Sequence, residues 1–461
     1  MRTTPSLRFA AFAVAASLLL GGTATANPKP PADGAGGAVR ATAASYVEHF
    51  YPRWFTYLQN PRDLAANSLT GPATMSPVFG LVVAPNDDTL YVRAFVDMTN
   101  GQPLILTVPS TTATYSLLTT DLFGNVFTTG VSTERPGTYA LTPPGWSGTL
   151  PPGVTQIPVP LAASSWIFRA DKYSSDGTDM REEAERFRLN LHLATPADYQ
   201  RDPSSGQARV LPVIVYGAKL KELADREIGR APLAYLRQLQ RAMHDRTTAP
   251  LSPADQALAD RFDRLFGNGV DPDEADAFAR GAQEAHARIV RNYLTHQGPT
   301  NWVHFTNVGI WTASEYLDRS SISEFLQYGN SRVTAAYYHA FTDGSGARLD
   351  ASEHGYRITF PAGQLPQARR FWSVTSYLPK SVTLVPNDAE KYVVASYTPG
   401  LVTAPDGSVT VYMTPKRPEG VPAGNWLPVP DGPFNVMLRV YGPEGSVADN
   451  TYVPPAVTPL D

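Results

Sequence analysis

Cysteine is absent from this chain of 461 residues. Disulfide bonds, thiolate metal ligands, cysteine nucleophiles and lipid-modified cysteine anchors are therefore excluded together. Charge of one sign is not in excess either, because the formal net charge is -4, so there is no electrostatic reason to expect a nucleic-acid partner. Hydrophobic runs long enough to span a membrane are also missing from the sequence.

The amino terminus carries the pattern of an export signal. Two arginines precede an apolar run over 9–20, which is too short for a membrane span. The letters "ATAN" then offer a small-residue cleavage site after Ala26. We predict a cleavable signal peptide over 1–26, a flexible leader over 27–39, and a secreted or extracytoplasmic protein.

The remaining composition is typical of a folded protein with many short strands. Hydrophobic residues make up 43% of the chain and charged residues 17%, which is not the balance of a disordered protein. The 42 prolines and 35 glycines, in a chain rich in Thr, Val and Tyr, indicate strands joined by frequent turns. The length exceeds what one hydrophobic core usually supports, so we expect two domains.

The hydrophobic pattern changes three times along the chain. Residues 41–58 have helical spacing up to Pro52, and 72–172 have a period of two with regular turn signals. Helical spacing returns over 178–296, and the period of two returns over 333–456.

The two strand-rich halves look like copies of each other. Five segments match in the same order, the last with its proline pair and arginine at identical spacing: "YVRAFVD" and "YYHAFTD", "LILTVP" and "YRITFP", "YSLLTT" and "WSVTSY", "YALTP" and "VYMTP", "PVPLAASSWIFR" and "PVPDGPFNVMLR". We therefore predict a mainly β protein with a helical insert. It would have two duplicated antiparallel, jelly-roll-like sandwich or barrel domains, over 40–175 and 301–461, joined by an α-helical segment over 176–300.

The first strand of each copy shows where the copies differ. Side chains alternate along a strand, so Tyr91, Arg93 and Asp97 share one face. The second copy keeps the aromatic and acidic positions but has His339 in place of Arg93. Separate function could lie at this difference, and sequence drift explains it equally well.

An acidic turn precedes the first strand. Asn86, Asp87 and Asp88 could form an Asx turn that fixes the start of the strand. Alternatively, Asp87 or Asp88 could face a pocket with Arg93 as its charge partner. No close counterpart of this triplet stands before the matching strand of the second copy.

Two arginines, Arg169 and Arg439, each end a largely apolar strand. The duplicated aspartates Asp97 and Asp343 are candidate partners for them. Because both domains would carry the pair, we favour a structural salt bridge over a catalytic role.

Common catalytic motifs are missing, but a family resemblance can be stated. We find no G-x-S-x-G elbow, H-E-x-x-H, Walker loop or Rossmann fingerprint. "PNDDTLYVRAFVD" and "YSLLTTDLFGN" resemble motifs of the bacterial family known as domain of unknown function 1254. "FWSVTSY", "DGSVTVYM", "NWLPVPDGPFNVMLRVYGP" and "YVPPAV" are similar to its partner, domain of unknown function 1214. The resemblance implies two jelly-roll-like domains with a helical connection.

Mapping the motifs onto this chain gives a set of polar and aromatic positions. Lys391 stands where the second domain often carries an arginine. The positions carried over from the resemblance are Asn86, Asp88, Tyr91, Asp121, Asn125, Arg169, Trp426 and Arg439.

Two functions from different classes remain open. The first is an exported hydrolase for a small polar or anionic substrate, such as a phosphate ester or a carbohydrate derivative, with Asp88 or Asp121 as general base or as ligand of a divalent metal. Arg93 would then act in catalysis, with Arg169 or Lys391 also holding the anion. The second is a non-catalytic envelope or secreted protein that binds a small ligand or takes part in assembly. The ligand-binding candidates are Asn86, Tyr91, Asn125, Arg169, His339, Lys391, Trp426 and Arg439; the metal, the cofactor and assembly into homo-oligomers stay open.

Overall fold

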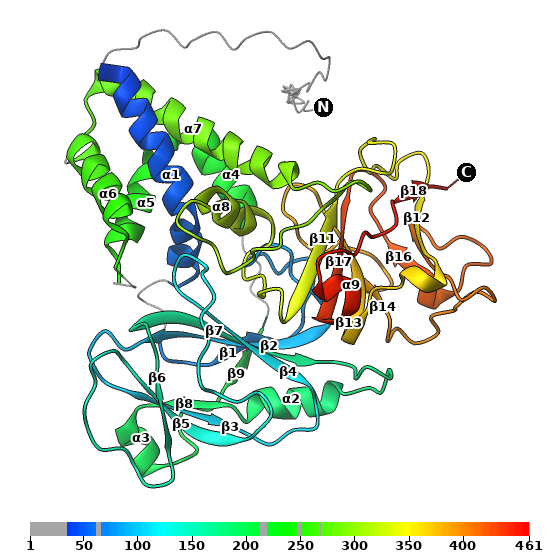
Figure 1. Cartoon of the computed structure of the whole chain (residues 1–461), viewed down its shortest axis with the longest axis horizontal. Coiled ribbons are helices and arrows are strands. Elements are labelled where there is room, and N and C mark those ends of the chain that lie inside the picture. The colour runs from blue at the N-terminus through cyan, green and yellow to red at the C-terminus, as the bar shows by residue number, and fades with distance from the viewer. Residues whose placement is uncertain (1–34, 61–65, 213–218, 247–249, 268, 461) are drawn as a thin grey trace, which may run out of the picture.

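The structure is a computed structural model that describes residues 35–60, 66–212, 219–246, 250–267 and 269–460. It is mainly β, with two strand-rich domains and a helical segment that packs beside both of them (Figure 1). The expected signal peptide and most of the expected leader lie outside the described residues. No helix among those described is long and apolar enough to cross a membrane.

Helix α1 (Ala35–Gln59) begins inside the segment expected to be flexible and runs past the proline expected to end it. Pro52 has no N–H group, so the carbonyl of Glu48 loses its helical partner. The hydroxyl of Ser320 replaces that partner, donating to Glu48 O at 2.7 Å within the buried interior. A neighbouring helix therefore repairs the defect, and α1 continues to Gln59.

The first domain packs two sheets around one core. One sheet has the strand order β4-β7-β2-β1-β9 and the other β6-β5-β3-β8. Its strands are β1 (Thr70–Pro72), β2 (Thr89–Asp97), β3 (Leu104–Val108), β4 (Tyr115–Thr120), β5 (Gly137–Thr142), β6 (Thr155–Pro158), β7 (Ala163–Asp171), β8 (His192–Ala194) and β9 (Arg209–Leu211).

This domain extends beyond its expected end at residue 175. Helix α2 (Arg181–Leu189) places Phe187 against Tyr115 and Phe168 of the sheet, and β8 places Leu193 in the same core. Sequence periodicity assigned these residues to the helical segment. Their apolar side chains instead complete the core of the first domain, with helix α3 (Pro196–Arg201) following on its surface.

The second domain repeats the two-sheet arrangement. Its sheets have the orders β10-β11-β17-β13-β14 and β16-β15-β12-β18. Its strands are β10 (Trp302–Val303), β11 (Ala335–Ala340), β12 (Tyr356–Phe360), β13 (Ala368–Tyr377), β14 (Val393–Ala395), β15 (Val409–Thr414), β16 (Trp426–Pro428), β17 (Asn435–Pro443) and β18 (Thr458–Pro459). The short helices η1 (Ala362–Gln364), η2 (Ala423–Asn425) and α9 (Gly445–Ala448) lie between them.

The matched segments of the sequence occupy matched places in the two domains. The order β4-β7-β2 corresponds to β13-β17-β11, and β6-β5-β3 corresponds to β16-β15-β12. In both domains the pair β5–β6 or β15–β16 is parallel while its neighbours are antiparallel, so the sheets are mixed. None of the described sheets closes into a barrel.

The helical segment forms a third body against α1. Helix α7 (Pro272–Thr295) lies along α1, and its Phe278, Ala282, Ile289 and Tyr293 are buried on one side. Figure 1 shows this bundle beside both β domains. The other helices are α4 (Leu220–Arg230), α5 (Pro232–His244), α6 (Pro253–Phe266) and α8 (Tyr316–Phe325).

Candidate functional site

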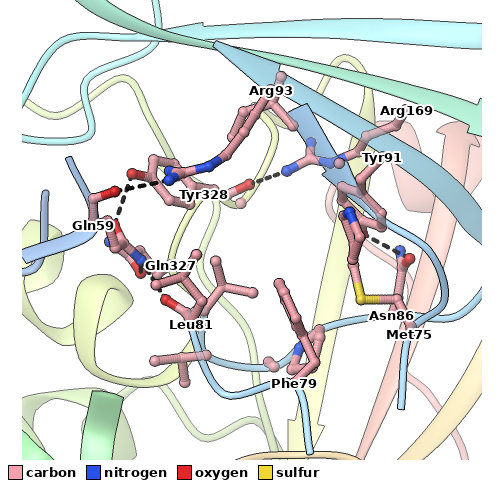
Figure 2. A pocket seen from close by; sticks show the side chains of 18 of the residues that line it. Gln59, Met75, Phe79, Leu81, Asn86, Tyr91, Arg93, Arg169, Gln327 and Tyr328 are labelled. Atoms are coloured by element: carbon pink, nitrogen blue, oxygen red, sulfur yellow. Dashed lines mark hydrogen bonds between the residues drawn. The ribbon is translucent and has the colours of Figure 1, made fainter. Parts of the chain in front are cut away.

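A cavity of about 310 Å³ lies where the two β domains meet the end of α1 (Figure 2). Strands β2 and β7 of the first domain and β11 and β17 of the second contribute to its wall. The loops over 75–86 and 326–330 close it. Most of the lining is apolar: Leu58, Met75, Phe79, Leu81, Val82, Val83, Ile167, Leu211 and Leu326.

The ionised side chains of this wall are three arginines. Arg93, Arg169 and Arg439 line the cavity, and none of them lies within 4.0 Å of a carboxylate oxygen among the described residues. No Asp, Glu, His or Lys belongs to the described part of the lining. The wall therefore combines an apolar surface with positive charge that no neighbouring acid pairs.

Arg169 occupies a fixed position near the end of β7. Its cross-strand neighbours are Tyr91 of β2 and Ser116 of β4, and its guanidinium lies over the ring of Tyr91 at 5.5 Å. Nη1 donates to Asn330 Oδ1 at 2.7 Å. Nη2 donates to Tyr328 O at 2.8 Å (Figure 2). The first domain thus holds the loop that leads into the second.

Arg439 has the matching place in β17 and makes the reciprocal contact. Its cross-strand neighbours are Tyr337 and Ser373, and Nη2 donates to Ala84 O at 2.7 Å. Ala84 belongs to the loop that leads into β2 of the first domain. The second domain therefore holds the approach loop of the first, as Arg169 does in the other direction.

Both of these arginine contacts end on backbone in the left-handed region. Ala84 has φ 51° and Tyr328 has φ 59°, conformations that cost a non-glycine residue about 1 kcal/mol or more. The N–H of Ala84 also donates to Val382 O at 2.9 Å. Strained backbone held in place by the opposite domain is a feature that clusters at functional sites.

Glutamine side chains close the cavity near α1. Gln59 and Gln327 exchange amide hydrogen bonds at 2.7 and 2.9 Å, and Tyr328 donates its hydroxyl to Gln59 Oε1 at 2.8 Å. Arg93 Nη2 donates to Gln59 O at 2.7 Å, as Figure 2 shows. Arg93 does face the cavity, but its partners are neutral oxygens and not the acidic turn.

The acidic turn before β2 joins the two domains. Asn86 accepts the hydroxyl hydrogen of Tyr91 at 2.7 Å and donates to the hydroxyl of Tyr441 in the second domain. Asp87 forms a half-buried salt bridge with Lys172 at 2.5 Å. Of the three residues in the triplet, Asn86 lines the cavity.

Asp88 is fully buried and points into the second domain. Its carboxylate accepts hydrogen bonds from Ser373 Oγ at 2.8 Å and from the hydroxyl of Tyr397 at 2.6 Å. Burial raises the pKa of Asp88, although the bond from Tyr397 and the charge of Arg439 oppose the rise. Asp88 does more than an Asx turn requires, and it does not line the cavity.

Asp121 lies in a turn of its own. It accepts hydrogen bonds from the N–H groups of Phe123 and Asn125, both at 2.8 Å, and from Asn125 Nδ2 at 2.6 Å. Burial raises the pKa of this carboxyl, and these bonds oppose the rise. Neither Asp121 nor Asn125 lines the cavity, so Asp88, Asp121 and Arg93 do not converge.

The remaining candidates belong to the second domain and lie outside the cavity lining. His339 is buried between the hydroxyl of Tyr293 at 3.0 Å and Asn435 Oδ1 at 2.7 Å, and burial lowers its pKa to about 3. Lys391 donates to the carbonyl of Ala423 in η2, and burial lowers its pKa to about 8. Trp426 donates Nε1 to Thr414 O at 3.1 Å.

The expected pairs of Arg169 with Asp97 and of Arg439 with Asp343 are wrong. Asp97 pairs with Arg246, a residue that follows the helical segment's α5, at 3.2 Å. Asp343 accepts N–H groups of its own turn. Arg169, Arg439 and Asp97 bind groups from distant segments, and Asp343 binds its own turn, which spacing along one strand cannot indicate.

One cluster among the described residues has the ligand types of a metal site. Asp225, His286 and Glu324 place single ligand atoms within 4.8 Å of one another, between α4, α7 and α8. Lys221 Nζ lies in the same cluster, in contact with Glu324 and at 3.2 Å from Asp225. Burial would raise the pKa of Glu324, but Lys221 and His286 together hold it down to about 2. The ammonium already supplies the positive charge that a metal would bring.

Sequence reasoning missed the residue of the second domain that corresponds to Asn86, which is Asn330. Asn330 accepts from Arg169, and its backbone N–H donates to the hydroxyl of Tyr337 at 2.8 Å, whereas Asn86 accepts the hydroxyl hydrogen of Tyr91 with its side-chain oxygen. Asn86 stands five residues before its tyrosine and Asn330 seven before its own. This difference in loop length conceals the correspondence from a fixed-spacing comparison.

Two family models match the chain. Residues 66–195 match the model described as "Protein of unknown function (DUF1254)", and residues 334–445 match "Protein of unknown function (DUF1214)". No curated protein matches the sequence.

Two solved structures are similar to this chain. A crystal structure of a protein from Vibrio parahaemolyticus is 18% identical, with a TM-score of 0.60, covering 92% of this chain and 100% of its own. A putative uncharacterised protein from Burkholderia cenocepacia is 15% identical, with a TM-score of 0.43, covering 92% of this chain and 94% of its own. At 18% identity, the similarity to the Vibrio parahaemolyticus protein shows a shared two-domain fold.

Proposed function

Since this chain belongs to the bacterial two-domain family that joins the 1254 and 1214 domains of unknown function, we propose that it binds a small, largely apolar molecule between those domains. In this proposal the protein is exported and non-catalytic. Export is inferred from the signal pattern at the amino terminus alone. The binding role is carried by one observation, the mainly apolar cavity at the domain junction.

The cavity has the character of a ligand site and not of a packing defect. A volume of about 310 Å³ is at the lower end of the range for sites of small organic molecules. Such sites are lined mainly by apolar side chains, with a few polar groups that fix orientation. Here the polar groups are the three arginines and neutral side chains such as Asn86, Tyr91 and Gln59, which hydrogen bonds hold in place.

The lining supports binding over hydrolysis. A hydrolase needs a base, a nucleophile or a metal in contact with the bound substrate. The described lining contains no carboxylate, imidazole or thiol, and the carboxylates of Asp88 and Asp121 are engaged elsewhere. Hydrolysis of a phosphate ester or carbohydrate derivative therefore ranks behind ligand binding.

We also infer that the two β domains are duplicates of a jelly-roll-like unit. Support comes from the equal strand orders β4-β7-β2 and β13-β17-β11 and from the matching parallel pairs. The rows Ser116–Arg169–Tyr91 and Ser373–Arg439–Tyr337 occupy equal positions in them. A binding site between two such units would lie near the approximate rotation axis that relates one unit to the other.

A fluorescence titration tests the binding role. The probe is N-phenyl-1-naphthylamine, a neutral apolar dye whose emission rises in an apolar site. We expect saturable binding to the mature wild-type protein. Val82→Trp, which fills part of the cavity, should weaken it about tenfold, or about 1.4 kcal/mol.

The matched control places the same side chain elsewhere. Leu365 is partly buried against the core of the second domain and does not line the cavity, so Leu365→Trp should leave probe binding unchanged. Equal weakening by both variants, or no saturable binding by the wild type, would overturn the proposal. Turnover of a phosphate ester that Asp88→Asn abolishes would instead favour the hydrolase.

A further inference from the structure

Resting on the proposed binding function, we infer that the ligand is an organic anion with an apolar body, and that its charged group binds at Arg439. The proposed function requires only an apolar molecule. This inference adds the chemical class of the ligand and the residue that distinguishes it from a neutral one.

The duplication supplies an internal comparison between two arginines in equal positions. Arg169 uses both terminal nitrogens, one on Asn330 and one on the carbonyl of Tyr328. Arg439 uses Nη2 on the carbonyl of Ala84 and lies against the side chain of Tyr377, whereas its buried Nη1 makes no hydrogen bond of normal geometry among the described residues. The two copies therefore differ by one unused donor.

The orientation of Asn86 explains the difference. Asn330 turns its amide oxygen to Arg169. Asn86 instead turns its oxygen to the hydroxyls of Tyr91 and Thr89, at 2.7 and 3.3 Å, and its nitrogen to Tyr441. No amide oxygen is left for Arg439. The Nη1 group that has an amide acceptor in the first copy therefore lacks one in the second.

An unpaired donor on a buried cation is costly. Arg439 is 2% exposed, and arginine remains charged at all pH values that a folded protein tolerates. A hydrogen bond to a charged group stabilises the folded state more than a bond between neutral groups does. A buried charged donor without an acceptor loses this stabilisation and keeps the cost of its desolvation. A carboxylate or similar oxyanion offers the acceptor that Nη1 lacks without displacing Ala84.

The surrounding charges favour an anion. Arg93 and Arg169 line the same wall, and no acidic side chain belongs to its described part. Asp88 contributes a negative charge toward Arg439, but its two oxygens already accept from Ser373 and Tyr397. Because Nη1 is buried, a side chain of the wall has to move aside for the anion to reach it.

Three probes with the same chain and different head groups test the inference: sodium octanoate, 1-octanol and octylammonium chloride. Each displaces N-phenyl-1-naphthylamine from the mature protein in competition titrations. We expect octanoate to bind about tenfold or more tightly than octanol, from one charge-assisted hydrogen bond, and octylammonium to bind weakest. Equal affinities would overturn the anion inference while leaving the apolar binding function intact; no displacement and no direct probe binding would remove both.

Variants locate the charged group. Arg439→Gln should reduce the preference for octanoate over octanol to within about twofold, because octanol never uses the charge. Arg93→Gln, on the same wall, keeps Arg439 and should retain most of the preference. A preference that survives Arg439→Gln and disappears in Arg93→Gln would overturn the assignment to Arg439.

A measurement on the wild type covers the case in which Arg439→Gln does not fold. The carboxyl carbon of labelled octanoate reports its own ionisation by nuclear magnetic resonance. Beside an unpaired arginine the bound acid should have its pKa lowered below that of the free acid, whereas a purely apolar site would raise it. A raised pKa for the bound acid would contradict the inference.

Discussion

Replacing Asp88 by alanine is the most direct perturbation of the domain junction. The carboxylate is 0% exposed and bridges the domains by accepting hydrogen bonds from Ser373 and Tyr397 at 2.8 and 2.6 Å. Its charge also faces Arg439, which has no carboxylate within 4.0 Å. Asp88→Ala removes both acceptors and that charge at once.

The expected cost follows from these contacts. Each buried hydroxyl that loses its acceptor costs about 1–3 kcal/mol. Removing the carboxylate also takes a nearby negative charge away from the buried Arg439, which has no carboxylate within 4.0 Å to replace it. We therefore expect Asp88→Ala to lower the free energy of unfolding by about 3–5 kcal/mol, and Asp88→Asn, which keeps one acceptor and the shape, by about 1–2 kcal/mol.

Urea unfolding at pH 7 measures this loss, followed by tryptophan fluorescence and by far-ultraviolet circular dichroism. The two signals also report whether the domains separate before they unfold. Asp87→Asn is the matched control, because its half-buried salt bridge to Lys172 should contribute only about 1 kcal/mol or less. If Asp88→Ala and Asp87→Asn cost the same, Asp88 is a turn residue and the bridging argument fails.

Two further outcomes follow from buried groups. Burial lowers the pKa of His339 to about 3 from its usual 6.5, so the unfolded chain binds more protons than the folded one between these pH values. The free energy of unfolding therefore falls as the pH drops from 6.5 to 3, by up to about 1.4 kcal/mol per pH unit. His339→Gln should flatten this slope in urea titrations at pH 4.5–6.5, and an unchanged slope would contradict a neutral buried histidine. Ser320→Ala should cost about 1–2 kcal/mol by orphaning Glu48 O. In a Pro52→Ala background, where the restored N–H can bond Glu48 O, the cost should fall, and an equal cost in both backgrounds would refute the repair of the proline defect.

The strand pattern was predictable because burial repeats along a strand with the period of its side chains. Val92 and Val96 face the core of the first domain, whereas Tyr91 and Arg93 face the cavity, as alternation from the sequence requires. The equivalence of Arg169 and Arg439 was predictable from the repeat, because the two arginines have equal spacing within the repeated segments.

The cavity itself was not predictable from spacing. Gln59, Gln327 and Tyr328 reach it from the end of α1 and from the loop after α8, segments that lie far apart in the chain. Hydrophobic periodicity describes which face of an element is buried, not which other element covers that face. For the same reason the sequence allows the acidic turn to be local structure or a catalytic site, but contains no signal for its contacts across the domain junction.

The cavity and the domain junction depend on the same residues. Arg169 and Arg439 each hold the strained approach loop of the opposite domain, and the carbonyls that they hold, from Tyr328 and Ala84, belong to cavity-lining residues. The energy that keeps this backbone strained comes from contacts that exist only when the domains are docked. A ligand that binds Arg439 would therefore bind the docked arrangement in preference to a separated one, and stabilise it by mass action. Binding and domain association are, on this reasoning, a single linked equilibrium.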